Sequence, residues 1–365
     1  MKPELEQLCA AFVENRDEVR KAFRRDNDAL YPVCANLFCA CGKKADAEQL
    51  KECRRVITRL TGLFSKFRGA KVRAILASVL AIGEDPEERM ALAKDYYRLL
   101  KRRFRDSEYL VLAAFLLTDL KGERLTEEKA VRGRELYRRM NRQHRMLTNK
   151  MDSIFAMLLA FSDKTDDGAA ADLEACYRTL KTAFSSSGDA QTSAQVLSVT
   201  AGAPEEKAQR VIDLYNALQE AGVKYGKAGE LPVLAALSLA DVPVAVLAEE
   251  IGEADAFLAG EKGYGTKDEE LKQRAMHAAM IVSDQYAGTG SVNATVTANT
   301  LNMLIAKGQA ARVSTLIEIA QGAAGALKGS GGKTEKTGDE SPEMIGSALG
   351  QDIADAIRKG AEKEP

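Results

Sequence analysis

The chain has 365 residues, of which 45% are hydrophobic and 29% charged, and a formal net charge of −1. This composition is ordinary for a folded soluble protein. No stretch of about 18 uncharged apolar residues is present, which argues against a bilayer-spanning helix. Acidic residues among the first 25 argue against a secretory signal. We therefore expect a cytoplasmic protein.

A short unit recurs six times and predicts the architecture. In each copy an aromatic or aliphatic residue precedes a second large apolar residue by three positions, and the first members are 38 to 40 residues apart. A fixed period of about 40 residues is typical of helical-pair arrays, in which each pair buries its apolar face against its neighbours. The units are Ile57/Leu60, Tyr97/Leu100, Tyr137/Met140, Tyr177/Leu180, Tyr215/Leu218 and Ala254/Phe257.

In chain order, we expect seven helical hairpins, the first at about 4–41 and the last ending near Tyr286. Asp85-Pro86 and Thr126-Glu127 are typical helix starts. The second helix of each hairpin is apolar all round, which predicts an inner position, while the first is more solvated. The fold class is therefore all-α, with about seven αα pairs stacked as an α-solenoid; whether it curves into a ring stays open. The apolar cores are Cys34–Ala40, Leu76–Ile82, Leu112–Leu117, Phe155–Phe161, Ala194–Val199, Leu234–Leu239 and His277–Val282.

After this 1–286 repeat domain the period is lost. Residues 287–327 are rich in Ala, Gly and Thr and predict a helical cap or appendage, with helices at Thr295–Lys307 and Ala310–Leu327. Residues 328–341 read as a flexible linker. Residues 342–365 predict a short amphipathic helix, for which docking on the chain itself or disorder is favoured over a dedicated partner. Its apolar stripe is Ile345, Leu349, Ile353 and Ile357.

Several of these segments carry a family resemblance. The residues are Phe67-Arg68-Gly69, the run Ser107-Glu108-Tyr109-Leu110-x-x-Ala113-Ala114, and Tyr137, Tyr177 and Tyr215. They resemble an uncharacterised bacterial family, the domain of unknown function numbered four thousand and three, over about residues 5–286. The resemblance implies a cytoplasmic, bacterial, all-helical protein and brings no activity or site residue.

Signatures of enzymes and cofactor sites are missing from the sequence. No P-loop, dinucleotide fingerprint, nucleophile elbow or zinc-protease motif occurs. The two histidines, His144 and His277, fall in different repeats, and His277 is expected to be a core residue. Four of the six cysteines lie close in sequence, but without the paired C-x-x-C spacing of zinc sites, so core thiols are favoured and no cofactor or metal is expected. They are Cys34, Cys39, Cys41 and Cys53.

Charge is divided unevenly along the chain. Residues 1–150 hold 33 Lys and Arg against 22 Asp and Glu, a surplus that the remaining residues reverse. Three basic stretches, Lys51–Arg73, Lys94–Arg105 and Lys129–Lys150, recur at about the repeat period, so we expect them on one edge of the array. The candidate polyanion- or partner-binding residues are Arg68, Lys71, Arg73, Arg98, Arg102, Arg103, Arg138, Arg139 and Arg142.

Three functions compete on this sequence. The favoured one is a non-catalytic α-solenoid scaffold that binds an unknown protein or peptide, because stacked hairpins present a long surface. The alternative is binding of RNA or another polyanion through residues 51–150, with Phe67, Phe104 and Tyr137 interleaved for base stacking. An α/α-toroid hydrolase is least favoured, because no nucleophile, base or metal set is evident.

Overall fold

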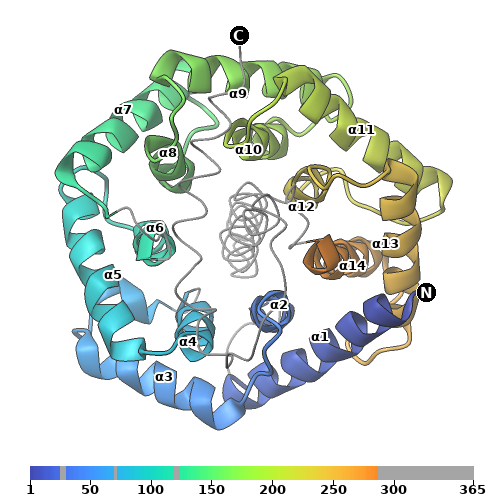
Figure 1. The fold of residues 1–365 in the computed structure, drawn as a ribbon, viewed down its shortest axis with the longest axis horizontal. Helices are drawn as coiled ribbons and strands as arrows, with labels where there is room; N and C mark the ends of the chain where they lie inside the picture. Colours follow the sequence, from blue (N-terminus) through green and yellow to red (C-terminus); the bar gives the residue numbers. More distant parts are fainter. Residues whose placement is uncertain (25–29, 70–71, 119–123, 287–365) are drawn as a thin grey trace, which may run out of the picture.

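The computed structural model describes residues 1–24, 30–69, 72–118 and 124–286, which form fourteen α-helices and the short 3-10 helix η2 (Lys66–Arg68). Helices alternate between an outer and an inner layer (Figure 1). The outer helices are α1 (Pro3–Ala22), α3 (Ala47–Leu60), α5 (Pro86–Lys101), α7 (Glu127–Gln143), α9 (Asp166–Lys181), α11 (Pro204–Glu220) and α13 (Val244–Ala259). The inner helices are α2 (Tyr31–Ala40), α4 (Arg73–Ile82), α6 (Glu108–Thr118), α8 (Asp152–Ala160), α10 (Ser187–Ser198), α12 (Leu231–Leu237) and α14 (Asp268–Tyr286).

The hydrophobic pattern decides the layer that each helix occupies. Inner helix α4 has the sequence RAILASVLAI, and every residue after Arg73 is buried. Outer helix α3 buries one stripe, at Leu50, Cys53, Val56 and Ile57, and exposes charged residues elsewhere. An all-round apolar helix must be enclosed, whereas a striped helix can cover it. The predicted assignment of inner and outer helices is thus confirmed.

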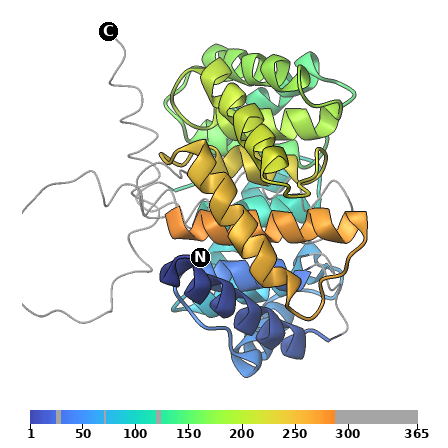
Figure 2. The same ribbon diagram turned by 90° about the vertical axis from the view of Figure 1, so that its right-hand side faces the viewer.

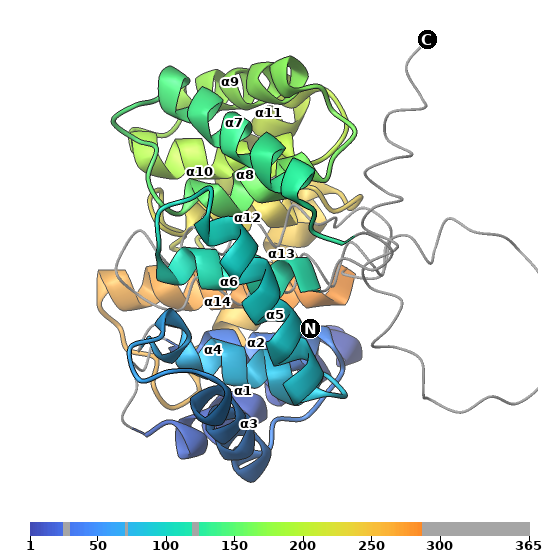
Figure 3. The same ribbon diagram turned by 90° about the vertical axis from the view of Figure 1, so that its left-hand side faces the viewer.

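The seven hairpins close into a ring. Helix α1 packs against α13 and α14, and α2 packs against α14, so the last hairpin contacts the first. Figures 1, 2 and 3 show the inner helices surrounding the axis, with outer helices slanting around the perimeter. The predicted helical-hairpin repeat is confirmed, and its array is a closed ring rather than an open superhelix.

Recurrent aromatic contacts join neighbouring hairpins. The Phe67 ring meets Tyr97 edge-on, with centroids 5.1 Å apart. Each partner aromatic follows the outer helix of the preceding hairpin, so each tyrosine packs against the hairpin before its own. Edge-to-face pairs favour one fixed geometry, which sets how successive hairpins meet. The other pairs are Phe104 with Tyr137 at 5.9 Å, His144 with Tyr177 at 4.3 Å and Phe184 with Tyr215 at 5.4 Å.

The ring has two distinct faces. Each hairpin repeats the same course, so the seven inner helices run in the same direction and begin on the same face (Figure 3). We call this the start face; it carries the loops from outer to inner helices, including residues 61–69, 102–107 and 144–151. Inner-helix N-termini carry partial positive charge, but the outer helices end on this same face, and the partial negative charge of their C-termini offsets it.

The predicted C-terminal elements, the cap or appendage at 287–327, the linker at 328–341 and the helix at 342–365, lie outside the described residues. Helix α14 ends at Tyr286, where the described part of the chain stops. Among the described helices, none combines the length and apolar content that crossing a membrane requires.

Candidate partner-binding face

The candidate basic residues cluster near the ends of outer helices on the first half of the ring. Arg98 lies near the end of α5, Arg102 and Arg103 just beyond it, and Arg68 in η2. Arg73 begins α4. The last third of α7 carries Arg138, Arg139 and Arg142, and Lys71 lies outside the described residues.

Carboxylates accompany most of these arginines. Such exposed ion pairs contribute little to stability, about 0–1 kcal/mol each, but they offset the positive charge locally. The expected line of positive charge is therefore interrupted by acids of the same or the next repeat. The pairs are Arg98 with Asp95, Arg103 with Glu127, Arg138 and Arg142 with Glu135, and Arg139 with Asp167.

Arg68 and Arg102 show opposite environments. Arg68 closes the end of α3: its Nε donates to Thr61 Oγ1 at 3.1 Å, and its Nη2 donates to the carbonyls of Thr58 and Thr61. A cation at helix carbonyls offsets the negative end of the helix dipole, which is a structural role. Arg102 is exposed and forms no ion pair within the described part of the chain.

The aromatic residues expected to stack on bases are engaged inside the protein. Phe67 is 2% exposed and Phe104 is 6% exposed. Both belong to the inter-hairpin contacts, and half-buried Tyr137 packs against Phe104 with a centroid distance of 5.9 Å. These rings lack the free faces that single-stranded nucleic acid requires.

A basic groove lies where α1, α3 and α4 meet. Its lining includes five cations and one carboxylate, Glu48. Lys21 pairs with Glu18 and Lys51 with Glu48, whereas Arg24 and Arg54 form no ion pair with a described residue. The cations are Lys21, Arg24, Lys51, Arg54 and Arg73.

Large apolar side chains are exposed in the start-face loops. Leu63 is 74% exposed and Phe64 is 95% exposed in the loop after α3, and Met146 is 93% exposed in the loop after α7. Single exposed apolar residues are common on protein surfaces, but two adjacent ones form a small apolar patch. Sequence analysis missed this patch, because hydrophobicity alone does not show that Leu63-Phe64 falls outside both flanking helices.

His277 lies in the core, and His144 contacts the next repeat. His277 is 1% exposed, its Nδ1 lies 3.0 Å from the Tyr264 hydroxyl, and its ring packs against Phe12. Burial, with the nearby Arg16 charge, lowers the pKa of His277 to about 3, so it is neutral at physiological pH. His144 Nε2 lies 2.9 Å from a Glu174 oxygen in the next repeat. The histidines lie in different repeats, as expected.

Asp152 is the most deeply buried carboxyl group with an altered pKa. It begins α8, is 2% exposed, and accepts hydrogen bonds from Gln195 Nε2 at 2.6 Å and Asn149 N at 2.5 Å. Burial raises the pKa of Asp152 to about 6. Because its inter-helix partner is an amide on α10, the arrangement joins two inner helices and does not form an acid pair.

The cysteine cluster lies in the first two hairpins. Cys34, Cys39 and Cys53 are buried, and Cys41 is half-buried. Within the described ranges, no three His, Cys, Asp or Glu side chains are grouped so as to hold a metal ion.

Basic side chains also close the carbonyl ends of inner helices, a role that sequence analysis missed. Arg132 on α7 donates to the carbonyls of Ala160 at 3.3 Å and Ser162 at 2.7 Å. Arg210 on α11 does the same at Ser238, at 2.5 Å, and Ala240, at 2.9 Å. The signal that could have revealed this role is the separation of Arg132 and Arg210 by about two repeat periods.

Comparison with known proteins gives a family and no activity. No curated protein and no solved structure matches the chain. A family model described as "Protein of unknown function (DUF4003)" matches residues 15–310, which extends past the expected end of the resemblance at residue 286. The match spans well over half of the chain, so this protein belongs to the DUF4003 family.

Proposed function

We propose that this chain is a non-catalytic cytoplasmic scaffold whose start face binds a protein segment rich in acidic and apolar side chains. The observation that carries the proposal is the exposure of Leu63 and Phe64, at 74% and 95%, in a start-face loop. Covering either side chain gains about 1.5–3 kcal/mol, and aromatic anchors of this kind dominate many interfaces.

Charge supports an acidic partner. Arg102 and Arg105 in the loop after α5, and Arg145 and Lys150 in the loop after α7, are exposed and form no ion pair with described residues. These loops follow the one that carries Phe64 around the start face. These exposed cations give the start face a positive potential, which steers acidic segments towards the surface.

A cytoplasmic location fits the cysteines. None of the six cysteines forms a disulfide; five of them are buried and one is half-buried. Cytosolic reductants keep such thiols reduced, whereas secreted proteins more often cross-link them. We also propose a bacterial source, on the basis of the family resemblance.

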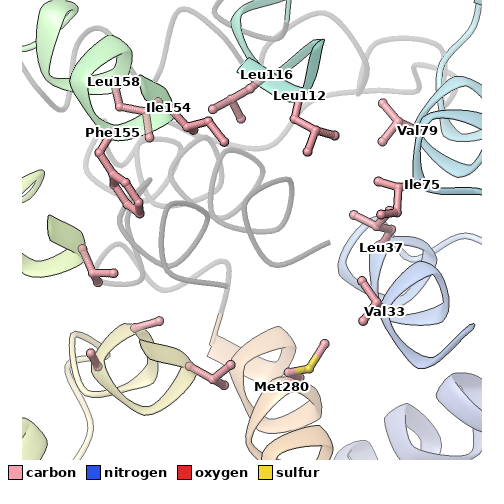
Figure 4. Packing of buried hydrophobic residues seen from close by; sticks show 14 of the residues in the cluster. Val33, Leu37, Ile75, Val79, Leu112, Leu116, Ile154, Phe155, Leu158 and Met280 are labelled. Carbon is pink, nitrogen blue, oxygen red and sulfur yellow. The ribbon is translucent and has the colours of Figure 1, made fainter. Parts of the chain in front are cut away.

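The alternative functions have weaker support. Nucleic acid would require free aromatic faces and an unneutralised basic track, but Phe67 and Phe104 are buried and five of the candidate arginines face acids. The hydrolase alternative would require convergent acids at the ring axis. Inner helices α4 and α6 bury no carboxylate, and Leu112 and Phe155 face the axis in Figure 4.

A comparative capture experiment tests the proposal. Full-length wild type, Leu63→Ser/Phe64→Ser and the control Val131→Ser are immobilised and exposed to native extract. Val131 is 46% exposed on outer helix α7, away from the start-face loops. We expect one protein to be retained by wild type and control and lost from the double variant, and a synthetic acidic-apolar peptide of that protein to bind with the same selectivity.

The polyanion alternative is an outcome of the same test. Binding of generic RNA that weakens steeply with salt, falls when Arg102, Arg103, Arg138, Arg139 and Arg142 are replaced by Glu, and is unchanged in Leu63→Ser/Phe64→Ser would favour nucleic acid. Equal retention of the captured protein by wild type and the double variant would refute the proposed face.

A further inference from the structure

The inner wall of the ring is apolar along its axis. Figure 4 shows side chains from several inner helices pointing towards the axis, in pairs four residues apart that form one stripe per helix. None of these side chains is more than 4% exposed. The labelled residues are Val33 and Leu37, Ile75 and Val79, Leu112 and Leu116, Ile154, Phe155 and Leu158, and Met280.

A ring of seven helices cannot fill its own centre. Neighbouring helix axes lie about 8–10 Å apart, which places seven axes on a circle of about 9–11 Å radius. Side chains reach about 5–6 Å from each axis, so they leave a bore about 10 Å across, the width of one α-helix. Water would enter an empty bore of that size and the wall would be exposed. Because Val79 is 2% and Leu112 is 4% exposed, the wall is covered.

The chain itself supplies a segment that could cover the wall. Inner helix α14 ends at Tyr286, so the chain leaves the described structure from the inner layer, with residues 287–365 still to come. Residues 287–309 are long enough to lead back into the bore. The predicted helix Thr295–Lys307 spans roughly 20 Å and the ten other residues roughly 33 Å when extended, whereas an inner helix of α14's length spans roughly 28 Å.

Composition selects one segment of the tail. Ala310–Leu327 holds two charged residues, Arg312 and Glu318, among 18, and is otherwise apolar, small or neutral. The predicted helix Thr295–Lys307 is also poor in charge, but its 13 residues span roughly 20 Å as a helix, against roughly 27 Å for Ala310–Leu327, so it covers less of the wall. A helix without a charged face is suited to complete enclosure. The segment 342–365 instead carries Asp352, Asp355, Arg358 and Lys359 between the residues of its apolar stripe, and burying those charges against an apolar wall would be costly.

We propose that Ala310–Leu327 docks in the bore as a central helix and covers the apolar wall. The segment then completes the core of the ring, and the axis is not a surface for an external partner. This inference goes beyond the proposed function, which concerns the start face, and either can fail without the other.

Thiol labelling of full-length protein tests the docking. Val79→Cys places a thiol on the wall, and Val131→Cys places one on the exposed outer surface of α7 as the control. In the parent chain we expect Cys at 79 to resist maleimide while Cys at 131 reacts. Adding Leu316→Asp/Ile319→Asp should make position 79 reactive, whereas the matched change Leu349→Asp/Ile353→Asp should not.

Hydrogen exchange of the unmodified chain keeps the test decisive if a variant fails to fold. Amides of 310–327 should exchange at least tenfold more slowly than those of 328–341. Rapid exchange throughout 310–327 would overturn the proposal. So would opening of position 79 by Leu349→Asp/Ile353→Asp alone, because that result would place the C-terminal amphipathic segment in the bore.

Discussion

The ammonium group of Lys2 lies 2.6 Å from the carboxylate of Glu250, although 248 positions separate them in the chain. Glu250 on α13 is 2% exposed and also accepts hydrogen bonds from the Tyr286 hydroxyl at 2.6 Å and Gln285 Nε2 at 3.2 Å. The N-terminal amine lies 2.6 Å from Glu253 on the same helix. Charged and polar contacts at Glu250 and Glu253 therefore contribute to closing the ring, together with the packing of α1 and α2 against the last hairpin.

Replacing Glu250 with Ala should weaken this closure. The change removes the shared acceptor of three donors, and we expect the free energy of unfolding to fall by about 2–4 kcal/mol. Urea unfolding measures the loss, and hydrogen exchange should accelerate in α1 and α14 more than in α7 and α8. The control is Glu249→Ala, because Glu249 is exposed beside Glu250. Equal losses in both variants would contradict a closing role for Glu250.

The inter-hairpin contacts can be tested by making the same Phe→Ala substitution at a buried position and at an exposed one. Phe184 is 1% exposed, and its ring meets Tyr215 edge-on at 5.4 Å. Phe184→Ala should lower the free energy of unfolding by about 3–5 kcal/mol through lost burial and a cavity. Phe64→Ala removes the same atoms from a 95% exposed site and should change the free energy of unfolding by no more than about 0.5 kcal/mol. Similar thermal denaturation of both variants would mean that the contact does not order the hairpins.

Sequence periodicity predicted the hairpins because each repeat tyrosine packs against an aromatic ring of the preceding hairpin, and this contact recurs once per repeat. It did not identify the partners of those tyrosines, which are Phe67, Phe104, His144 and Phe184. The partners change in residue type and lie 30 to 33 positions before their tyrosine, outside the regular helices. A pattern search based on helical spacing passes over such loop residues.

Closure of the ring and neutralisation of the basic stretches were beyond sequence analysis for a different reason. Both depend on which charges meet in space. Arg139 faces Asp167 of the next repeat, and Lys2 faces Glu250 of the last hairpin. Charge counting registers these residues but not their pairing, because charged side chains occur throughout the helix surfaces. The exposed Leu63-Phe64 pair was hidden likewise, since burial is a property of the fold.

Arg132 provides a test of the carbonyl-capping role that the sequence left unseen. Its guanidinium donates to the carbonyls of Ala160 and Ser162 and pairs with Asp166 at 3.0 Å. Arg132→Met keeps most of the aliphatic stem but removes these donors, so the free energy of unfolding should fall by about 2 kcal/mol. Arg138→Met, on the same helix but in an exposed pair, should cost no more than about 0.5 kcal/mol. Urea unfolding of the two variants separates a cap from a surface charge.

His277 should make the stability of the ring depend on pH. Its pKa is lowered to about 3 in the folded protein, by burial and by the Arg16 charge, and returns to about 6.5 on unfolding. The unfolded chain therefore binds the proton first as the pH falls, so acidification below 6.5 favours unfolding. Between pH 7 and 5 this contribution amounts to about 2 kcal/mol.

The variant His277→Phe isolates this effect, because it retains a ring against Phe12 but removes the titrating group. Asp152 acts in the opposite direction, since its raised pKa of about 6 makes the folded state bind the proton first, but it is present in both proteins and cancels in their comparison. Urea unfolding at pH 7, 6 and 5 should show a stability gap between wild type and variant that shifts by about 2 kcal/mol in favour of the variant on acidification. A gap that stays constant with pH would show that His277 gains its proton while the ring is folded, and would rule out the sealed environment on which the expectation rests.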